Sequence, residues 1–271
     1  MSSQNLPKGE RIDRIADLVL RNGEVGLDEL VALLGVSRMT IHRDLEVLEA
    51  RGVLRKVRNG ATARPSSSFE SNFEFRAAQS AAAKERLATH AARLIEPGDV
   101  ILLDEATTLL PMIPHLADVE GLTVVSNFLP IQDAVARFEN VRLIALSGEY
   151  IRQYHTFGGP LCEAAVGQFR INRYFTSTTA IDRSAAYHPN SLIASTKKAM
   201  MRASVRSYLL ADATKFARTA LHKVADLDDF ELILTDEPPP RDCRDFLRPL
   251  GGKLVVVGPQ NPQEQGPLPG A

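Results

Sequence analysis

Residues 36–62 read VSRMTIHRDLEVLEARGVLRKVRNGAT. Ser37 is a suitable N-cap for a helix, because its hydroxyl can accept a hydrogen bond from an otherwise unpaired amide in the first turn. Ile41, Leu45 and Leu48 then fall at i, i+4 and i+7, which gives this helix one apolar row for packing. The side chains left on its outer face are those of Arg38, Met39, His42, Arg43 and Glu46.

After this helix the spacing of apolar residues becomes short and alternating. VLRKV and ATA predict two strands joined at Asn59-Gly60, a dipeptide suited to the positive backbone angles of a tight hairpin turn. The hairpin is basic, and we expect Arg55, Lys56 and Arg58 to lie along the phosphates of a nucleic acid.

Two helices are expected upstream of this stretch. Apolar residues at helical spacing follow Pro7 until Asn22-Gly23, and a second, shorter apolar pattern ends at Gly35. Three helices followed by a basic hairpin form the order of a winged helix-turn-helix domain, which we place at residues 7–64.

In such a domain the helix that starts at Ser37 enters the major groove. The Arg38 guanidinium can bond guanine O6 and N7, and the Thr40 hydroxyl can bond a phosphate. Met39 can meet a thymine methyl or serve as a partial core residue. The candidate DNA-binding residues are Ser37, Arg38, Met39, Thr40, His42, Arg43, Arg55, Lys56 and Arg58.

The charge of the chain is unevenly distributed. Residues 37–64 carry seven basic and three acidic side chains, a net +4, so the remainder carries −5 within a total of −1. A local basic patch on a slightly acidic protein suits a compact nucleic-acid contact, although solvated helix faces carry similar runs. Asp44 is an unusual choice against DNA, so we expect it to have a structural role in an ion pair with Arg43 or Arg55.

Length and composition limit the class of protein. The 271 residues are enough for two domains, and 44% hydrophobic with 24% charged residues is typical of a soluble globular protein. No apolar run of about 18 residues occurs, so we expect no membrane partner and a location in the cytoplasm. Cys162 and Cys243 are far apart and belong to no metal-binding motif, which predicts no metal, no cofactor and no disulfide framework.

The second half of the chain has a different pattern. Residues 65–80, PSSSFESNFEFRAAQS, predict a linker. Short apolar runs then recur, most of them separated by helix-length segments: VILLD, TVVSN, RLIALSG, RYFTSTTAID, SYLLAD, ELILTD and KLVVVG. Alternating strands and helices predict a mostly parallel α/β sheet at residues 81–260, followed by a flexible tail at residues 261–271. Ligands of such sheets bind beyond the carboxyl ends of the strands.

Both halves of the chain resemble one family. The N-terminal pattern of the DeoR family of bacterial transcriptional regulators is matched by VSRMTIHRDL, GVLR and NGA. The effector domain of that family, a relative of the ribose-phosphate isomerase sheet, resembles KERLATHAARLIEPGDVILLDEATT, VVSN, LSGEY, FGGP, the segment with Lys197, LLADATKF and LTD. The resemblance implies a sequence-specific regulator, more a repressor of carbohydrate catabolism genes than an activator. Its partners would be double-stranded operator DNA and a sugar or sugar-phosphate effector.

The residues expected to bind the effector lie mostly at the strand ends. They are Asp104, Glu105, Thr107, Thr108, Ser126, Asn127, Gly148, Asp182, Lys197, Asp212 and Lys215. Short hydroxyl and amide side chains suit a polyol or a phosphate, but polar strand ends also cap helices in any α/β domain.

The loop at residues 104–108 departs from the family pattern. The family usually has DSGTT there, which is thought to hold a phosphorylated sugar, whereas this chain has DEATT. Ala106 removes an easy positive backbone angle, and Glu105 adds a negative charge that repels a phosphate. We therefore expect an effector less anionic than a sugar phosphate, or a phosphate placed elsewhere, near Lys197 or Lys215. The alternative is that Glu105 points into solvent or caps the following helix.

Two other functions stay open at this point. A sugar-phosphate isomerase-like enzyme would use Asp104, Glu105, Asp182 or Lys197 as its base. The DNA-reading domain and the missing glycine-rich phosphate loop weigh against it, and we expect no catalytic residue. A ligand-independent DNA-binding protein predicts that no small molecule changes operator affinity. Two-fold operators favour a homo-oligomer, either a dimer or a tetramer.

Overall fold

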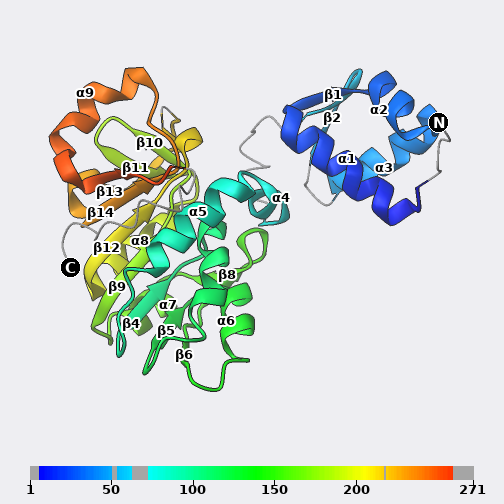
Figure 1. Ribbon diagram of the computed structural model, residues 1–271. Coiled ribbons are helices and arrows are strands. Elements are labelled where there is room, and N and C mark those ends of the chain that lie inside the picture. The colour runs from blue at the N-terminus through cyan, green and yellow to red at the C-terminus, as the bar shows by residue number, and fades with distance from the viewer. Residues whose placement is uncertain (1–5, 51–53, 63–72, 217, 259–271) are drawn as a thin grey trace. The chain divides into compact units, whose positions relative to one another are not determined.

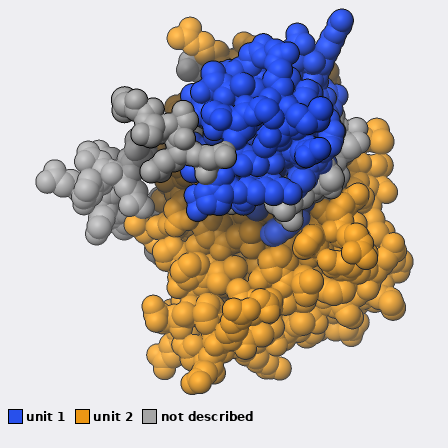
Figure 2. All heavy atoms as spheres, turned by 90° about the vertical axis from the view of Figure 1, so that its right-hand side faces the viewer, with its two compact units in different colours: residues 1–79 blue, residues 80–271 orange. Residues whose placement is uncertain are grey.

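The chain forms two compact units, Met1–Gln79 and Ser80–Ala271, which Figure 2 shows in different colours. This computed structural model describes residues 6–50, 54–62, 73–216 and 218–258. The expected tail at residues 261–271 lies outside the described residues. Within the described part, no helix combines the length and the apolar character needed to cross a bilayer.

The first unit contains the three expected helices, α1 (Lys8–Asn22), α2 (Leu27–Leu34) and α3 (Arg38–Ala50) (Figure 1). Gly35 closes α2 in the left-handed conformation, with φ of 65°, and its amide bonds the Val31 carbonyl. The apolar row predicted for α3 is buried in the core of this unit, where it packs with residues of α1 and α2. The order of helices read from the sequence is therefore confirmed.

Three short strands complete the first unit: β1 (Glu24–Gly26), β2 (Arg55–Val57) and β3 (Gly60–Thr62), in the order β1-β3-β2. The hairpin is present, but the turn predicted at Asn59-Gly60 is wrong by one residue. Val57 pairs with Gly60, so Arg58 and Asn59 form the turn, and neither Asn59 nor Gly60 has a positive φ.

Gly60 serves a different purpose from the one expected of it. It pairs with Gly26 of β1, and a Cβ added to Gly60 would lie 2.1 Å from the Val25 carbonyl oxygen. Glycine is therefore required at this position by the close approach of the β1 backbone rather than by a turn.

The segment expected as a linker contains regular structure. Helix α4 (Phe73–Ala78) lies within residues 65–80, while residues 63–72 lie outside the described part. The second unit begins two residues after α4, at Ser80.

The core of the second unit is a parallel sheet of seven strands with the order β15-β14-β12-β9-β4-β5-β6. Each of the seven predicted apolar runs supplies one strand. The strands are β4 (Val100–Leu103), β5 (Thr123–Ser126), β6 (Arg142–Ala145), β9 (Ile171–Thr176), β12 (Ser204–Leu210), β14 (Leu232–Thr235) and β15 (Leu254–Val256). From β4 the chain builds outward through β5 and β6, then returns to the other side of β4 with β9. The strand order therefore reverses between β4 and β9.

Helices cover both faces of this sheet, as Figure 1 shows. Helix α5 (Ala81–Ala92) packs against the 3₁₀ segment η1 (Thr107–His115), β12 and β14, and α6 (Leu129–Val135) packs on β5 and β6. Helices α7 (Pro160–Val166) and α8 (Ser191–Ala203) share a core cluster that includes Leu102 and Tyr174.

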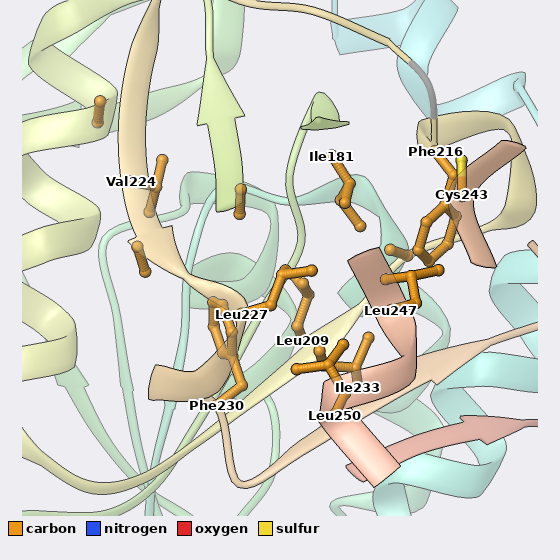
Figure 3. Close-up of a cluster of buried hydrophobic side chains, with 14 residues drawn as sticks. Ile181, Leu209, Phe216, Val224, Leu227, Phe230, Ile233, Cys243, Leu247 and Leu250 are labelled. Atoms are coloured by element: carbon orange, nitrogen blue, oxygen red, sulfur yellow. The ribbon is translucent and has the colours of Figure 1, made fainter. Parts of the chain in front are cut away.

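The RYFTSTTAID run is divided between two sheets. Strand β9 ends at Thr176, and β10 (Ala180–Asp182) pairs instead with β11 (Ala185–His188), which pairs with β13 (His222–Asp226). Figure 3 shows the apolar cluster below this antiparallel sheet, where Leu209 and Ile233 of the large sheet pack with Leu247 of α9 (Arg244–Leu247).

The remaining described elements are short. Strands β7 (Glu149–Ile151) and β8 (Thr156–Gly158) form an antiparallel hairpin around η2 (Arg152–Tyr154). The other 3₁₀ segments are η3 (Ala213–Lys215), η4 (Leu227–Asp229), η5 (Arg241–Cys243) and η6 (Arg248–Lys253). Cys162 and Cys243 are buried and free.

Candidate functional site

The first turn of α3 is exposed and capped. The Ser37 hydroxyl accepts a hydrogen bond from the Thr40 amide at 3.2 Å and lies 2.9 Å from the Thr40 hydroxyl. The Met39 side chain is 62% exposed, although an apolar side chain gains nothing from water. Arg43 is exposed and His42 is half-buried. The predicted first-turn residues therefore share a surface that a partner can reach.

The Arg38 guanidinium is paired within the unit. Its Nε donates to Asp28 Oδ1 at 2.9 Å, and Nη2 donates to the same oxygen. This hydrogen bond raises the pKa of Arg38, and the Asp28 charge adds to the effect. Both side chains are exposed, at 64% for Arg38 and 76% for Asp28, so a phosphate or a guanine can replace the carboxylate at small cost.

Asp44 has a structural role, but the partner we expected is wrong. Its carboxylate accepts two hydrogen bonds from Arg11 of α1, at 2.6 Å and 3.3 Å, rather than pairing with Arg43 or Arg55. Both side chains are nearly buried, and this bond raises the pKa of Arg11. The ion pair ties α1 to α3 and is shielded from solvent.

The three hairpin cations differ in their availability. Arg55 and Arg58 are exposed. The Lys56 ammonium donates to Glu46 Oε1 at 2.9 Å, and the Lys56 amide donates to Glu49 at 2.7 Å. Lys56 therefore joins β2 to α3, and a phosphate would have to compete with Glu46 for it.

Asp104 is the centre of a buried network in the second unit. It follows β4 at the point where the strand order reverses, the place where open α/β sheets bind ligands. Its Oδ2 accepts hydrogen bonds from Tyr174 at 2.5 Å and from the Thr176 hydroxyl, both on β9. Its Oδ1 accepts from the Ala106 amide at 3.1 Å. The network thus joins the two strands on either side of the reversal.

Lys197 of α8 completes this network with Glu105. Its Nζ lies 2.6 Å from Asp104 Oδ2 and 2.9 Å from Glu105 Oε1, and all three side chains are at most 3% exposed. The alternative that Glu105 points into solvent is therefore wrong. Sequence alone left open whether Lys197 could hold a phosphate, and the structure shows it already paired with two carboxylates.

Burial and charge act on this cluster in opposite directions. Burial raises the pKa of Asp104, Lys197 pulls it down, and Glu105 raises it further, so the net shift is upward. Burial alone would lower the pKa of Lys197, but the two adjacent carboxylates outweigh it and raise that pKa. Lys197 therefore stays an ammonium.

Two predicted residues at the end of β5 play different roles. The Ser126 hydroxyl donates to the Leu103 carbonyl at 2.7 Å and accepts from the Phe128 amide at 3.1 Å, so its bonds fix the backbone. The Asn127 amide nitrogen donates to the Phe157 carbonyl at 2.6 Å, whereas its buried Oδ1 has no hydrogen-bond partner in the described structure. Asn127 is the predicted residue best placed to accept from a ligand.

Three further predicted residues lie around the same edge. The Lys84 ammonium donates to the Thr107 hydroxyl at 3.1 Å, and Thr108 bonds Ser177 at 3.4 Å. A Cβ on Gly148 would lie 2.5 Å from the Gly158 carbonyl oxygen, so the β7–β8 hairpin can pack closely here.

Three predicted residues are not part of the Asp104 network in the described structure. Asp182 is wrong as a parallel strand end, because it closes β10 in the antiparallel sheet. Asp212 follows β12 as expected, but it caps η3 by accepting from the Thr214 amide at 3.0 Å. Lys215 Nζ lies 4.0 Å from Asp212. These residues support local structure.

Sequence reasoning missed Tyr174, Thr176, Ser177 and Lys84. Tyr174 and Thr176 lie inside an apolar strand pattern, where side chains are ordinarily assigned to the core. Burial raises the pKa of Tyr174 well above its usual range, and Asp104 adds to the rise, so its hydroxyl stays a donor. The sequence signal for these residues was the polar end of β9. It points to the site only once the strand order, with β9 beside β4, is known.

A helix-turn-helix unit and a parallel α/β unit with a buried polar switch point define a class of protein: transcriptional regulators that carry a sensor domain. The family model for the DeoR C terminal sensor domain matches residues 79–237, and that for the DeoR-like helix-turn-helix domain matches residues 11–67. The chain therefore belongs to the DeoR family of transcriptional regulators.

Relatives match over nearly the whole chain. The L-fucose operon activator of Haemophilus influenzae is 33% identical over 87% of this chain and 95% of that protein. The lactose phosphotransferase system repressor of Staphylococcus aureus is 30% identical over 84% of this chain and 92% of that protein. Ribose 5-phosphate isomerase A of Neisseria gonorrhoeae has a TM-score of 0.36 and 15% identity over 49% of this chain and 52% of that chain. That last likeness is too slight to bear on activity.

Proposed function

We propose that this regulator represses genes of carbohydrate use. A sugar-derived effector, bound at the β4–β9 switch point, would change the affinity of the regulator for operator DNA. The observation that carries the proposal is the buried Asp104–Glu105–Lys197 cluster with the partnerless Asn127 Oδ1 beside it. A domain with only a structural role gains nothing from burying three charges and an unsatisfied oxygen. Relatives named for fucose and lactose systems support a sugar as the ligand class.

The DNA contact is proposed for the first turn of α3 and the β2–β3 hairpin. Exposed Arg38, Met39 and Arg43 would face base edges and nearby phosphates, and exposed Arg55 and Arg58 would follow the backbone. One reading helix per chain and two-fold operators support a homo-oligomer, a dimer or a tetramer. A cytoplasmic location belongs to the same proposal. Repression is favoured over activation, although a relative of each kind matches the chain.

A catalytic role is not part of the proposal. A general base must reach the proton of a bound substrate, and the Asp104 carboxylate already accepts from Tyr174, Thr176 and Lys197. An assay for isomerisation of pentose and hexose phosphates would detect catalysis directly.

Selection of genomic fragments by the full-length protein tests the function. We expect a short set of fragments that share a two-fold sequence, which the protein protects from nuclease cleavage. Recovery of random fragments, with no protected sequence, would contradict sequence-specific regulation.

A further inference from the structure

The hydrogen-bonding capacity of Lys197 is used within the protein. Besides Asp104 and Glu105, its Nζ lies 3.2 Å from the Thr176 hydroxyl and 3.1 Å from the Ser177 carbonyl oxygen. An ammonium has three N–H donors, and here four oxygens surround it. A phosphate could pair with Lys197 only by displacing a carboxylate that is itself buried.

The charges of this edge are already balanced. Lys84, which donates to Thr107 in the same loop, and Lys197 supply two ammonium groups, while Asp104 and Glu105 supply two carboxylates. All four side chains are nearly or fully buried. An added phosphate would leave one to two uncompensated negative charges in a place from which water is excluded, and buried charge without a partner is strongly disfavoured.

The unsatisfied group at this edge is an acceptor. Leu103 of β4 pairs with Ser126 of β5. Asp104 and Asn127 are the next residues along these two adjacent strands. Asn127 is fully buried, and because its nitrogen donates to Phe157, its partnerless atom is the oxygen. A ligand hydroxyl would satisfy that oxygen, whereas a phosphate oxygen would repel it.

Cys162 of α7 brings no positive charge to this edge. Burial raises the pKa of the Cys162 thiol to about 12, and the charges of Glu163 and then Glu105 add to the rise. Cys162 in turn lies against Gly148, where a Cβ would be 3.0 Å from the Cys162 Cβ. The thiol therefore stays neutral, and Gly148 beside it carries no side chain.

We propose that Glu105 is a specificity residue that supplies Lys197 with an internal anion, so that the effector is an uncharged polyhydroxy compound such as a free sugar or polyol, and phosphorylated sugars are excluded. This inference rests on the proposed sensing role of the switch point. Without the Glu105 charge, Lys84 and Lys197 face the single carboxylate of Asp104, and the site should then accept phosphate.

Titration with inorganic phosphate, followed by phosphorus NMR on the full-length protein, tests this proposal. We expect no saturable binding to the wild type. Glu105→Gln and Glu105→Ser should each bind phosphate saturably, at least about tenfold more tightly than the weakest binding that the titration can detect. Glu163→Gln is the matched control, because it removes the same charge near α7 without touching Lys197, and it should behave like the wild type.

Calorimetry on the wild type gives a second readout that needs no variant. The probes are two matched pairs: ribose with ribose 5-phosphate, and fructose with fructose 1-phosphate. In each pair the phosphorylated sugar should bind no more tightly than the free sugar. Saturable phosphate binding by the wild type, tighter binding of a phosphorylated sugar, or folded Glu105 variants indistinguishable from the wild type would each overturn the proposal. Circular dichroism establishes folding. Because these titrations contain no DNA, failure of the operator experiment would be recognised separately.

Discussion

In the proposed DNA contact, Arg38 has to exchange one partner for another. Its present partner, Asp28, is exposed, so the ion pair contributes little and does not compete strongly with a guanine edge. Arg38→Ala should weaken operator binding roughly tenfold or more while changing the affinity for random duplex much less. Fluorescence anisotropy with both duplexes measures this, and equal losses on the two would rule out base reading by Arg38. Asp28→Asn, which removes only the carboxylate charge that competes for Arg38, should not weaken binding to either duplex.

The Arg11–Asp44 pair makes a prediction about stability. Asp44→Ala leaves the Arg11 guanidinium nearly buried without its carboxylate, which should destabilise the first unit by about 3 kcal/mol. Hydrogen exchange of the α1 and α3 amides reports on this unit alone. Asp28→Ala removes an exposed carboxylate of the same type and should leave exchange nearly unchanged. Similar protection of the α1 and α3 amides in the two variants would show that the Arg11–Asp44 pair does not stabilise the first unit.

At the scale of elements, the β2–β3 hairpin depends on a glycine contact. Gly60→Ala places a Cβ 2.1 Å from the Val25 carbonyl oxygen, so β1 and β3 must separate. Gly26→Ala is the matched control in the same residue pair, because the nearest atom to its Cβ is 3.9 Å away. We expect Gly60→Ala to accelerate hydrogen exchange in β1 and β3 and to weaken binding to every duplex, and Gly26→Ala to do neither. Comparable exchange in both would contradict the packing described.

The turn of that hairpin should act through phosphates. Arg58 occupies the turn and is exposed, so Arg58→Ala should weaken operator and random duplex alike and reduce the slope of log affinity against log salt by about 1. A salt series for the variant and the wild type measures both slopes. An unchanged slope would place Arg58 away from the DNA.

Periodicity predicted the elements better than it predicted their contacts. Seven apolar runs became seven parallel strands, and the apolar row of α3 is buried, because burial of one face is written directly into local spacing. The turn was predicted one residue too late because Gly60 is required by its contact with β1 and not by the turn. Strand β1 is too short to show a pattern in the sequence. The division of β9 from β10 was missed for a similar reason, since one continuous run serves two sheets.

The candidate site was predictable only in part. Asp104, Glu105 and Asn127 stand at strand ends, where sequence reasoning looks for ligands. Lys197 lies 93 positions from Asp104 along the chain, and no local pattern states which carboxylates it meets. Tyr174 was hidden within an apolar strand, so its bond to Asp104 required the strand order.

At the scale of the whole molecule, the proposed regulation requires the two units to influence each other. An effector can change operator affinity only if it binds two states of the protein with different affinities. The same factor must then appear in reverse, because DNA has to change effector affinity equally. A ligand-independent DNA-binding protein would show neither effect.

The most direct measurement is therefore operator affinity with and without an unphosphorylated sugar that binds in calorimetry. We predict that the sugar weakens operator binding and that operator DNA weakens sugar binding by the same factor, determined by anisotropy and calorimetry on the full-length protein. A sugar that binds the second unit and leaves operator affinity unchanged would contradict the account.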